Sequence, residues 1–220
     1  MTDAIRKAVL HIDPLKSTVK TELLHQDGTR TVKHIPSDAL VSSLQENSHI
    51  APQATGLLPP GCISLTLRKD GWDVTLQSTM ERDTVFYHKT GYADFPLPHF
   101  LLRCQLQNDM LRNFRMAVVE PVELKPNSKL YRFPFPNVNG FSLCVGTNRF
   151  SGYDTLWKLR GVMHRVLSIP FGDDYYRPEH TKLGLSAREL FEHLRDKEPA
   201  YYYSDVLIPN GKTLADFIGG

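Results

Sequence analysis

The sequence has few cysteines, no long apolar run and no marked excess of one charge. Its 220 residues include three cysteines, Cys62, Cys104 and Cys144, and this odd set without a CxxC pair excludes a disulfide scaffold and a cysteine-based zinc site. No apolar stretch reaches the roughly 18 residues that a membrane-crossing helix needs. With 26 basic and 24 acidic residues, the net charge of +2 gives no basic excess of the kind that marks nucleic-acid binding. Any sulfur chemistry must therefore come from one free thiol.

Sequence motifs for common cofactors and nucleophiles are also missing. The chain has no GxxxxGK(S/T) loop for ATP, no HExxH or paired-histidine spacing for zinc, and no GxSxG elbow. We therefore expect no cofactor and no metal. The first residues, from Met1 to Lys7, contain no apolar segment of a signal peptide, which favours a cytoplasmic protein that has no membrane partner.

Length and composition fit a core domain with a small N-terminal appendage. Residues 1–50 predict a hairpin, turning at Asp27-Gly28, and then a short helix that begins near Ser37. Residues 46–60 are rich in proline and glycine and are the best linker candidate. We nevertheless assign residues 1–50 to the same domain as the core, residues 51–220.

The segment from Cys62 to Glu120 shows the alternation of antiparallel strands. Apolar and polar side chains alternate on both sides of Asp70-Gly71, which predicts a hairpin with a two-residue turn. A later pair of strands is joined by Asn108-Asp109. The expected strands cover residues 63–67, 72–76, 84–88, 100–106 and 111–119. Short connections and a polar face favour an antiparallel meander over a parallel sheet.

After Pro121 the pattern changes to a loop and then to helices. Ser186 and Glu189 form the sequence pattern of a capping box at a helix start. The expected elements are a structured loop over 125–150, helices over 156–167, 186–194 and 213–218, and a strand at 201–203. Gly219-Gly220 fits a helix C-cap better than the tail of a modifier. Strands followed by helices indicate an α+β fold.

One stretch of the expected loop, YRFPFPNVNGFSLCVG over residues 131–146, contains a motif. Pro136-Asn137-Val138, Gly140 and Leu143-Cys144-Val145 follow the order of the active-site stretch of ubiquitin-conjugating enzymes, which this segment resembles. Phe135 stands where that family has a histidine, and the gap from asparagine to cysteine is slightly shorter.

The chain is more similar still to the divergent bacterial branch of that superfamily, the prokaryotic ubiquitin-conjugating-like family that includes PRTRC system protein B. That branch has a proline-rich approach, a Cys-x-Gly motif, here Cys144-Val145-Gly146, and a downstream histidine in place of the upstream one. His180 is in the most similar place, and His164 is the runner-up.

This resemblance implies a ubiquitin-conjugating fold, with an antiparallel meander, a structured active-site loop and C-terminal helices. It implies that Cys144 accepts a ubiquitin-like modifier as a thioester from a ThiF-type activating enzyme and transfers it to an amine or another nucleophile. Asn137 is then a structural residue or the oxyanion donor, and His180 activates the acceptor or deprotonates Cys144. A JAB-family deconjugating peptidase is a further implied partner, in a bacterial antiviral-defence or plasmid-associated operon.

Simpler interpretations of the same residues stay open. A cysteine among aliphatic residues is commonly a small buried apolar residue, which is our interpretation of Cys62 and Cys104. Asn137 also fits an Asx-turn, and Asp173-Asp174 fits a solvated loop pair as well as an acidic pair that positions a lysine. Phe135 in place of histidine favours a catalytically silent module that has the same fold and binds a modifier or an activating enzyme. A third interpretation is an accessory protein of a plasmid system that acts by binding alone.

Overall fold

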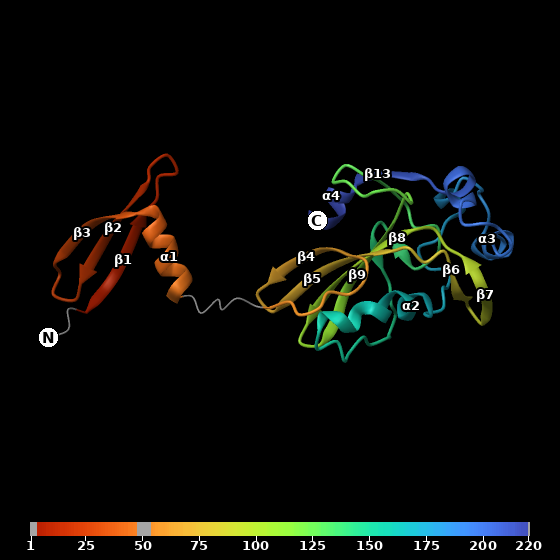
Figure 1. The fold of residues 1–220 in the computed structure, drawn as a ribbon, viewed down its shortest axis with the longest axis horizontal. Helices are drawn as coiled ribbons and strands as arrows, with labels where there is room; N and C mark the ends of the chain where they lie inside the picture. The colour runs from red at the N-terminus through yellow and green to blue at the C-terminus, as the bar shows by residue number, and fades with distance from the viewer. Residues whose placement is uncertain (1–3, 48–53, 220) are drawn as a thin grey trace. The chain divides into compact units, whose positions relative to one another are not determined.

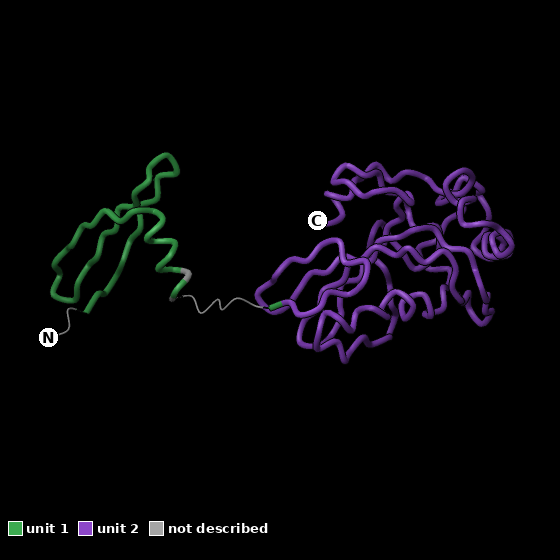
Figure 2. The backbone as a smooth tube through the Cα atoms, viewed as in Figure 1, with its two compact units in different colours: residues 1–54 green, residues 55–220 purple. Residues whose placement is uncertain are grey.

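A computed structural model describes residues 4–47 and 54–219 of the chain (Figure 1). The chain forms two compact units, residues 1–54 and residues 55–220 (Figure 2). The boundary between the units falls inside the expected linker. The assignment of residues 1–50 to the same domain as residues 51–220 stays a prediction.

The first unit is a three-stranded antiparallel sheet in the order β1-β2-β3, followed by one helix. Its elements are β1 (Ile5–His11), β2 (Thr18–His25), β3 (Arg30–Pro36) and α1 (Ser37–Asn47). The hairpin of β2 and β3 and the helix that begins at Ser37 confirm the sequence prediction. Strand β1 is missing from that prediction because its apolar residues, Ala8 to Leu10, form a run instead of alternating.

The second unit is built on one antiparallel sheet, whose main path runs β11-β12-β9-β8-β5-β4. Strand β10 attaches to this sheet through β9 and pairs in turn with β13. The strands are β4 (Cys62–Arg68), β5 (Gly71–Ser78), β8 (Phe100–Gln107), β9 (Met110–Val119), β10 (Lys129–Tyr131), β11 (Val138–Asn139), β12 (Ser142–Leu143) and β13 (Pro209–Thr213). Every pair in this sheet is antiparallel, which confirms the antiparallel sheet and the α+β class.

The prediction that residues 84–88 form the third strand of this meander is wrong. A strand does lie there, β6 (Arg82–Tyr87), but it pairs with β7 (Thr90–Pro96) in a separate two-stranded sheet. The chain therefore leaves the main sheet after β5 and returns to it at β8. Local alternation identifies a strand without identifying its partner, which is the physical reason for the error.

The turn between β4 and β5 also lies one residue earlier than predicted. Arg68 pairs with Gly71, so the two turn residues are Lys69 and Asp70. Gly71 opens β5 instead, where a Cβ atom would lie 1.9 Å from the carbonyl oxygen of Leu106 on β8. The glycine is therefore required by the close approach of two strands and not by the turn.

Helices follow the strands, as the sequence predicts. They are η1 (Leu156–Gly161) and α2 (Val162–Leu167), then η2 (Pro178–His180), α3 (Ala187–Leu194), η3 (Tyr202–Val206) and α4 (Leu214–Gly219). The capping box of α3 is confirmed, because the Ser186 hydroxyl accepts the Glu189 N–H while the Glu189 carboxylate accepts the Ser186 N–H. The strand expected at 201–203 is wrong, since the π-helical turn η3 begins there and buries Tyr202 completely.

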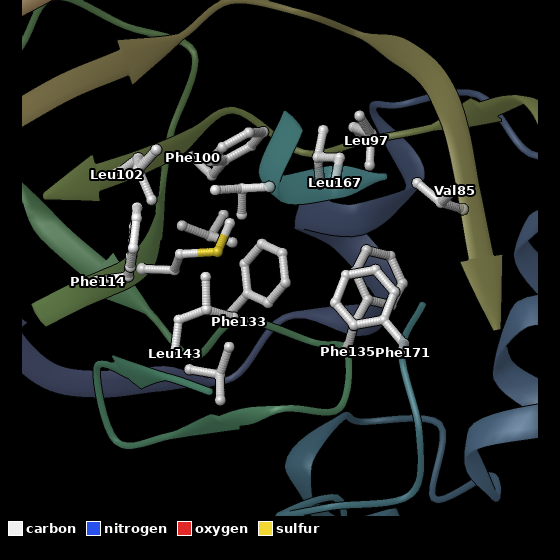
Figure 3. Close-up of a cluster of buried hydrophobic side chains, with 14 of the residues drawn as sticks. Val85, Leu97, Phe100, Leu102, Phe114, Phe133, Phe135, Leu143, Leu167 and Phe171 are labelled. Atoms are coloured by element: carbon white, nitrogen blue, oxygen red, sulfur yellow. The ribbon is translucent and has the colours of Figure 1, made fainter. Parts of the chain in front are cut away.

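The two faces of the main sheet contact separate apolar clusters. Alternation along β8 places Leu102 in the larger cluster and Leu101 in the smaller one. The larger cluster contains Phe133 and Phe135, which lie between β10 and β11 in sequence (Figure 3). Helix α4 supplies Leu214 and Phe217 to the smaller cluster. The loop with the cysteine motif is thus attached to the larger core.

Candidate functional site

The three cysteines differ in exposure, in the way that their sequence positions predict. Cys104 on β8 is fully buried, and burial raises the pKa of its thiol to about 12. Cys62, at the start of β4, is half-buried, and burial raises the pKa of its thiol as well. Cys144 lies directly after β12 and is exposed. All three lie in the described part of the chain, and Cys144 is the most exposed of them.

Strand alternation explains why Cys144 faces outward. Leu143, the last residue of β12, points into the larger apolar cluster beside Phe133 (Figure 3). The next side chain in an extended segment points to the opposite side. Val138 on β11 pairs with Leu143, and the backbone N–H of Cys144 donates to the carbonyl of Asn137 at 2.8 Å. The thiol is therefore held at the end of a short hairpin with a fixed backbone.

Asn137 connects this hairpin to the loop of residues 170–174. Its side-chain amide donates to the carbonyl of Pro170, and its side-chain oxygen accepts the N–H of Gly172, each at 3.2 Å. Its backbone N–H donates to the carbonyl of Asp174 at 2.8 Å. Asn137 is buried and has a φ of 65°, in the left-handed region that asparagine tolerates better than most residues. These bonds support the structural role of Asn137, and its role as an oxyanion donor stays a prediction.

Phe135, the residue before Pro136 in the motif, belongs to the core. Its side chain is 2% exposed, and its ring stacks on Phe191 of α3 with centroids 5.0 Å apart. Phe171 lies beside it, at 5.6 Å between ring centroids (Figure 3). An apolar ring surrounded by apolar rings exchanges no proton, so this position contributes packing and no acid–base chemistry.

The loop of residues 170–174 is also bound to the hairpin of β6 and β7. The N–H of Phe171 donates to the carbonyl of Phe86, and the N–H of His88 donates to the carbonyl of Phe171, both at 2.8 Å. The Asp173 carboxylate accepts the Tyr87 hydroxyl at 2.5 Å and lies 3.1 Å from Nε2 of His88. Asp173 and Asp174 are both exposed, as a solvated loop pair would be, and Asp173 is in addition hydrogen-bonded to Tyr87 and His88.

The electrostatics of this cluster follow from its hydrogen bonds. The hydroxyl of Tyr87, followed by the ring of His88, holds the pKa of Asp173 below its usual value. Partial burial, together with the bond to Asp173, raises the pKa of Tyr87 to about 12. Sequence analysis missed Tyr87 and His88 because 85 residues separate His88 from Asp173 and no local pattern links them.

The two candidate histidines lie in different surroundings. His180, at the end of η2, lines a cavity of about 440 Å³ together with both residues of β11. Burial, followed by the charge of Arg132, lowers the pKa of its ring. His164 on α2 is instead paired with Asp83 on β6, with 2.8 Å between Nδ1 and a carboxylate oxygen. His180 therefore lies against the hairpin of Cys144, although within residues 54–219 neither ring is hydrogen-bonded to that thiol.

Within residues 4–47 and 54–219, no three His, Cys, Asp or Glu side chains gather where a metal ion could bind. No helix in this described part is long and apolar enough to cross a bilayer. No protein-family model matches the chain, and searches of curated proteins and of solved structures find no match either. Function is therefore inferred from the chain's own residues.

Proposed function

We propose that the second unit is a ubiquitin-conjugating-like domain of a bacterial cytoplasmic enzyme. In this proposal Cys144 accepts a ubiquitin-like modifier as a thioester and transfers it to an amine or another nucleophile. The observation that carries the proposal is the exposure of Cys144 on a hairpin fixed by Asn137, within the motif Pro136-Asn137 to Cys144-Val145-Gly146. An antiparallel sheet, a structured loop and then helices, in that order, are further support for a ubiquitin-conjugating fold.

The proposed reaction consists of two acyl transfers. The Cys144 thiolate attacks the thioester carbonyl that joins the modifier to its activating enzyme, and the thiolate of that enzyme leaves. An acceptor amine then attacks the new thioester, loses a proton and releases the Cys144 thiolate. A ThiF-type enzyme supplies the activated modifier in this scheme, since the chain has no ATP-binding motif. A JAB-family peptidase would reverse the final bond.

The proposed attack by Cys144 uses the thiolate, so the reaction needs a group that accepts the proton of the thiol. His180 is the histidine beside this hairpin, and its lowered pKa keeps the ring neutral and able to accept a proton at pH 7. We assign that role to His180. Asn137 positions the backbone of Cys144, and an amide placed at a developing oxyanion would contribute roughly 3 kcal/mol in addition.

The test incubates the full chain with the activating enzyme, the modifier and ATP, followed by non-reducing electrophoresis. We expect an adduct that reductant removes, that Cys144→Ala abolishes and that Cys144→Ser converts to a reductant-resistant ester. Cys62→Ala is the matched control and should keep the adduct, because Cys62 lies on β4, away from the motif. An adduct that survives Cys144→Ala, or that disappears in Cys62→Ala, contradicts the assignment.

A catalytically silent binding module is the second candidate, and Phe135 is the observation that favours it. The buried ring removes the upstream histidine of the classical family. The rate of iodoacetamide labelling measured against pH separates the two candidates. A Cys144 that labels faster than a free thiol near neutral pH supports the enzyme, and one that matches a free thiol at every pH supports the silent module.

A further inference from the structure

A cationic cavity lies against β11, the edge strand of the hairpin that carries Cys144. Its volume, about 440 Å³, is within the range of small-molecule sites. The lining residues are Arg132, Val138, Asn139, Gly140, Tyr175, Arg177 and His180. All seven lie in the described second unit, and none of them is acidic. The cavity therefore presents two guanidinium groups and an imidazole to whatever enters it.

The three basic groups act on one another across the cavity. The charges of Arg132 and Arg177 both lower the pKa of the His180 ring, in addition to the effect of burial. Glu179 opposes them, but its carboxylate lies 3.9 Å from the Arg177 guanidinium and both side chains are mostly exposed. Exposed pairs of this kind contribute little, so Glu179 leaves Arg177 available to a ligand.

Tyr175 suits an organic group. It supplies an aromatic ring that is 54% exposed, whereas Val138 is 5% exposed and belongs to the larger apolar cluster. Tyr175 has a φ of 60°, in the left-handed region that residues with a β-carbon rarely adopt. Strained residues of this type concentrate at functional sites.

The cavity is formed before any ligand enters it. The loop that leads to Tyr175 is held by the bonds of Asn137 to Pro170, Gly172 and Asp174. Beyond it, the hydroxyl of Tyr176 donates to the carbonyl of Leu185 at 2.8 Å. The segment around Tyr175 is held on both sides, so it loses little conformational entropy when a ligand binds, which favours affinity.

We propose that this cavity binds a small organic anion, a phosphate ester or a carboxylate. The charged group lies between Arg132 and Arg177, and the organic part contacts Tyr175. Arginine suits either anion because its planar donors match two oxygens at once. The cavity is larger than a bare ion requires, which is why we propose an organic ligand. This site goes beyond the proposed conjugation reaction, and its test does not require that activity.

The test is a titration of the ¹⁵N-labelled full chain with phenyl phosphate, benzoate and inorganic phosphate, followed by amide chemical shifts. We expect saturable shifts confined to Arg132 and to residues 138–140 and 175–180. Phenyl phosphate should bind several-fold more tightly than inorganic phosphate, because its ring contacts Tyr175. The ratio of phenyl phosphate to benzoate affinity identifies the preferred anion. Shifts that do not saturate, or that spread over the other basic side chains, overturn the proposal.

Matched arginine variants localise the binding. Arg132→Gln and Arg177→Gln should each weaken phenyl phosphate binding about tenfold, the effect of one charge-assisted hydrogen bond. Arg195→Gln removes an exposed arginine after α3 and should leave the affinity unchanged. The charges of Arg132 and Arg177 lower the pKa of the His180 ring. Bound phenyl phosphate carries the opposite charge and should raise this pKa, which ¹H NMR measures. Equal weakening in Arg195→Gln, or a His180 pKa that saturating phenyl phosphate does not move, contradicts the site.

Discussion

Replacing Asn137 with alanine tests the residue that joins the Cys144 hairpin to the loop of residues 170–174. The change removes two side-chain hydrogen bonds, to Pro170 and from Gly172, each worth roughly 1 kcal/mol. It also leaves alanine at a φ of 65°, which costs about 1 kcal/mol more. We expect the free energy of unfolding of the second unit to fall by about 3 kcal/mol.

Asn137→Gly separates the two contributions. Glycine adopts a positive φ without strain, so this variant loses the hydrogen bonds alone and should lose about 2 kcal/mol. Asn139→Ala is the matched control, because Asn139 is the exposed asparagine two residues later in the same hairpin. A surface change of this kind should stay within about 0.5 kcal/mol of the parent protein.

Urea unfolding followed by tryptophan fluorescence measures these free energies for the correct unit. Both tryptophans, Trp72 and Trp157, belong to residues 55–220, so the first unit contributes no tryptophan signal. Comparing unfolding midpoints at a constant slope gives the differences in stability. A loss below about 1 kcal/mol in Asn137→Ala refutes the proposed role of the two bonds. Equal losses in Asn137→Ala and Asn137→Gly refute the contribution from backbone strain.

Three further predictions follow from exposure, hydrogen bonding and capping. Brief alkylation of the native protein, mapped by mass spectrometry, should label Cys144 first and Cys104 only after unfolding. The reason is that Cys104 is buried and the pKa of its thiol is about 12, whereas Cys144 is exposed. Equal labelling rates at Cys144 and Cys104 would contradict this prediction. Tyr87→Phe should raise the pKa of Asp173, followed by ¹³C NMR, because the Tyr87 hydroxyl is the main group that lowers it. Because the pKa of Asp173 is lower in the folded protein than in the unfolded chain, its carboxylate stabilises the fold at a pH above the unfolded pKa. That stability is lost as the pH falls through the folded pKa, so the stability of Tyr87→Phe should depend less on pH in the acid range. Ser186→Ala should cost about 1 kcal/mol by urea unfolding, whereas an unchanged midpoint would show that the capping box adds no stability.

Local signals explain which parts of the fold the sequence could predict. Strands β8 and β9 are joined by a two-residue turn, in which Asn108 and Asp109 adopt the positive φ values, 47° and 59°, that a tight hairpin turn requires. Strand β7 carries Asp94 at a φ of 52° and ends at Pro96, so its alternation is irregular and it was not predicted. Its pairing with β6, away from the main sheet, depends on the packing of the whole unit.

In the candidate site, too, some features follow from local sequence and others depend on the whole fold. The outward direction of Cys144 follows from a local pattern, since Leu143 beside it is apolar and faces the core. The bond of Asp173 to Tyr87 depends on a fold that brings together residues 86 positions apart. A sequence pattern therefore identifies the thiol, whereas the residues that hold its loop require the structure.

The burial of Phe135 decides from which side Cys144 can be activated. A histidine in that place would have to desolvate its ring among Phe171 and Phe191, which costs several kcal/mol without a hydrogen-bond partner. In the proposed reaction the proton acceptor is instead His180, which lines the cationic cavity against β11. An anion bound there would favour the protonated form of the His180 ring, which accepts no further proton. The two proposals are therefore coupled through His180, and an anion in the cavity should slow any reaction of Cys144 that uses this histidine as its base.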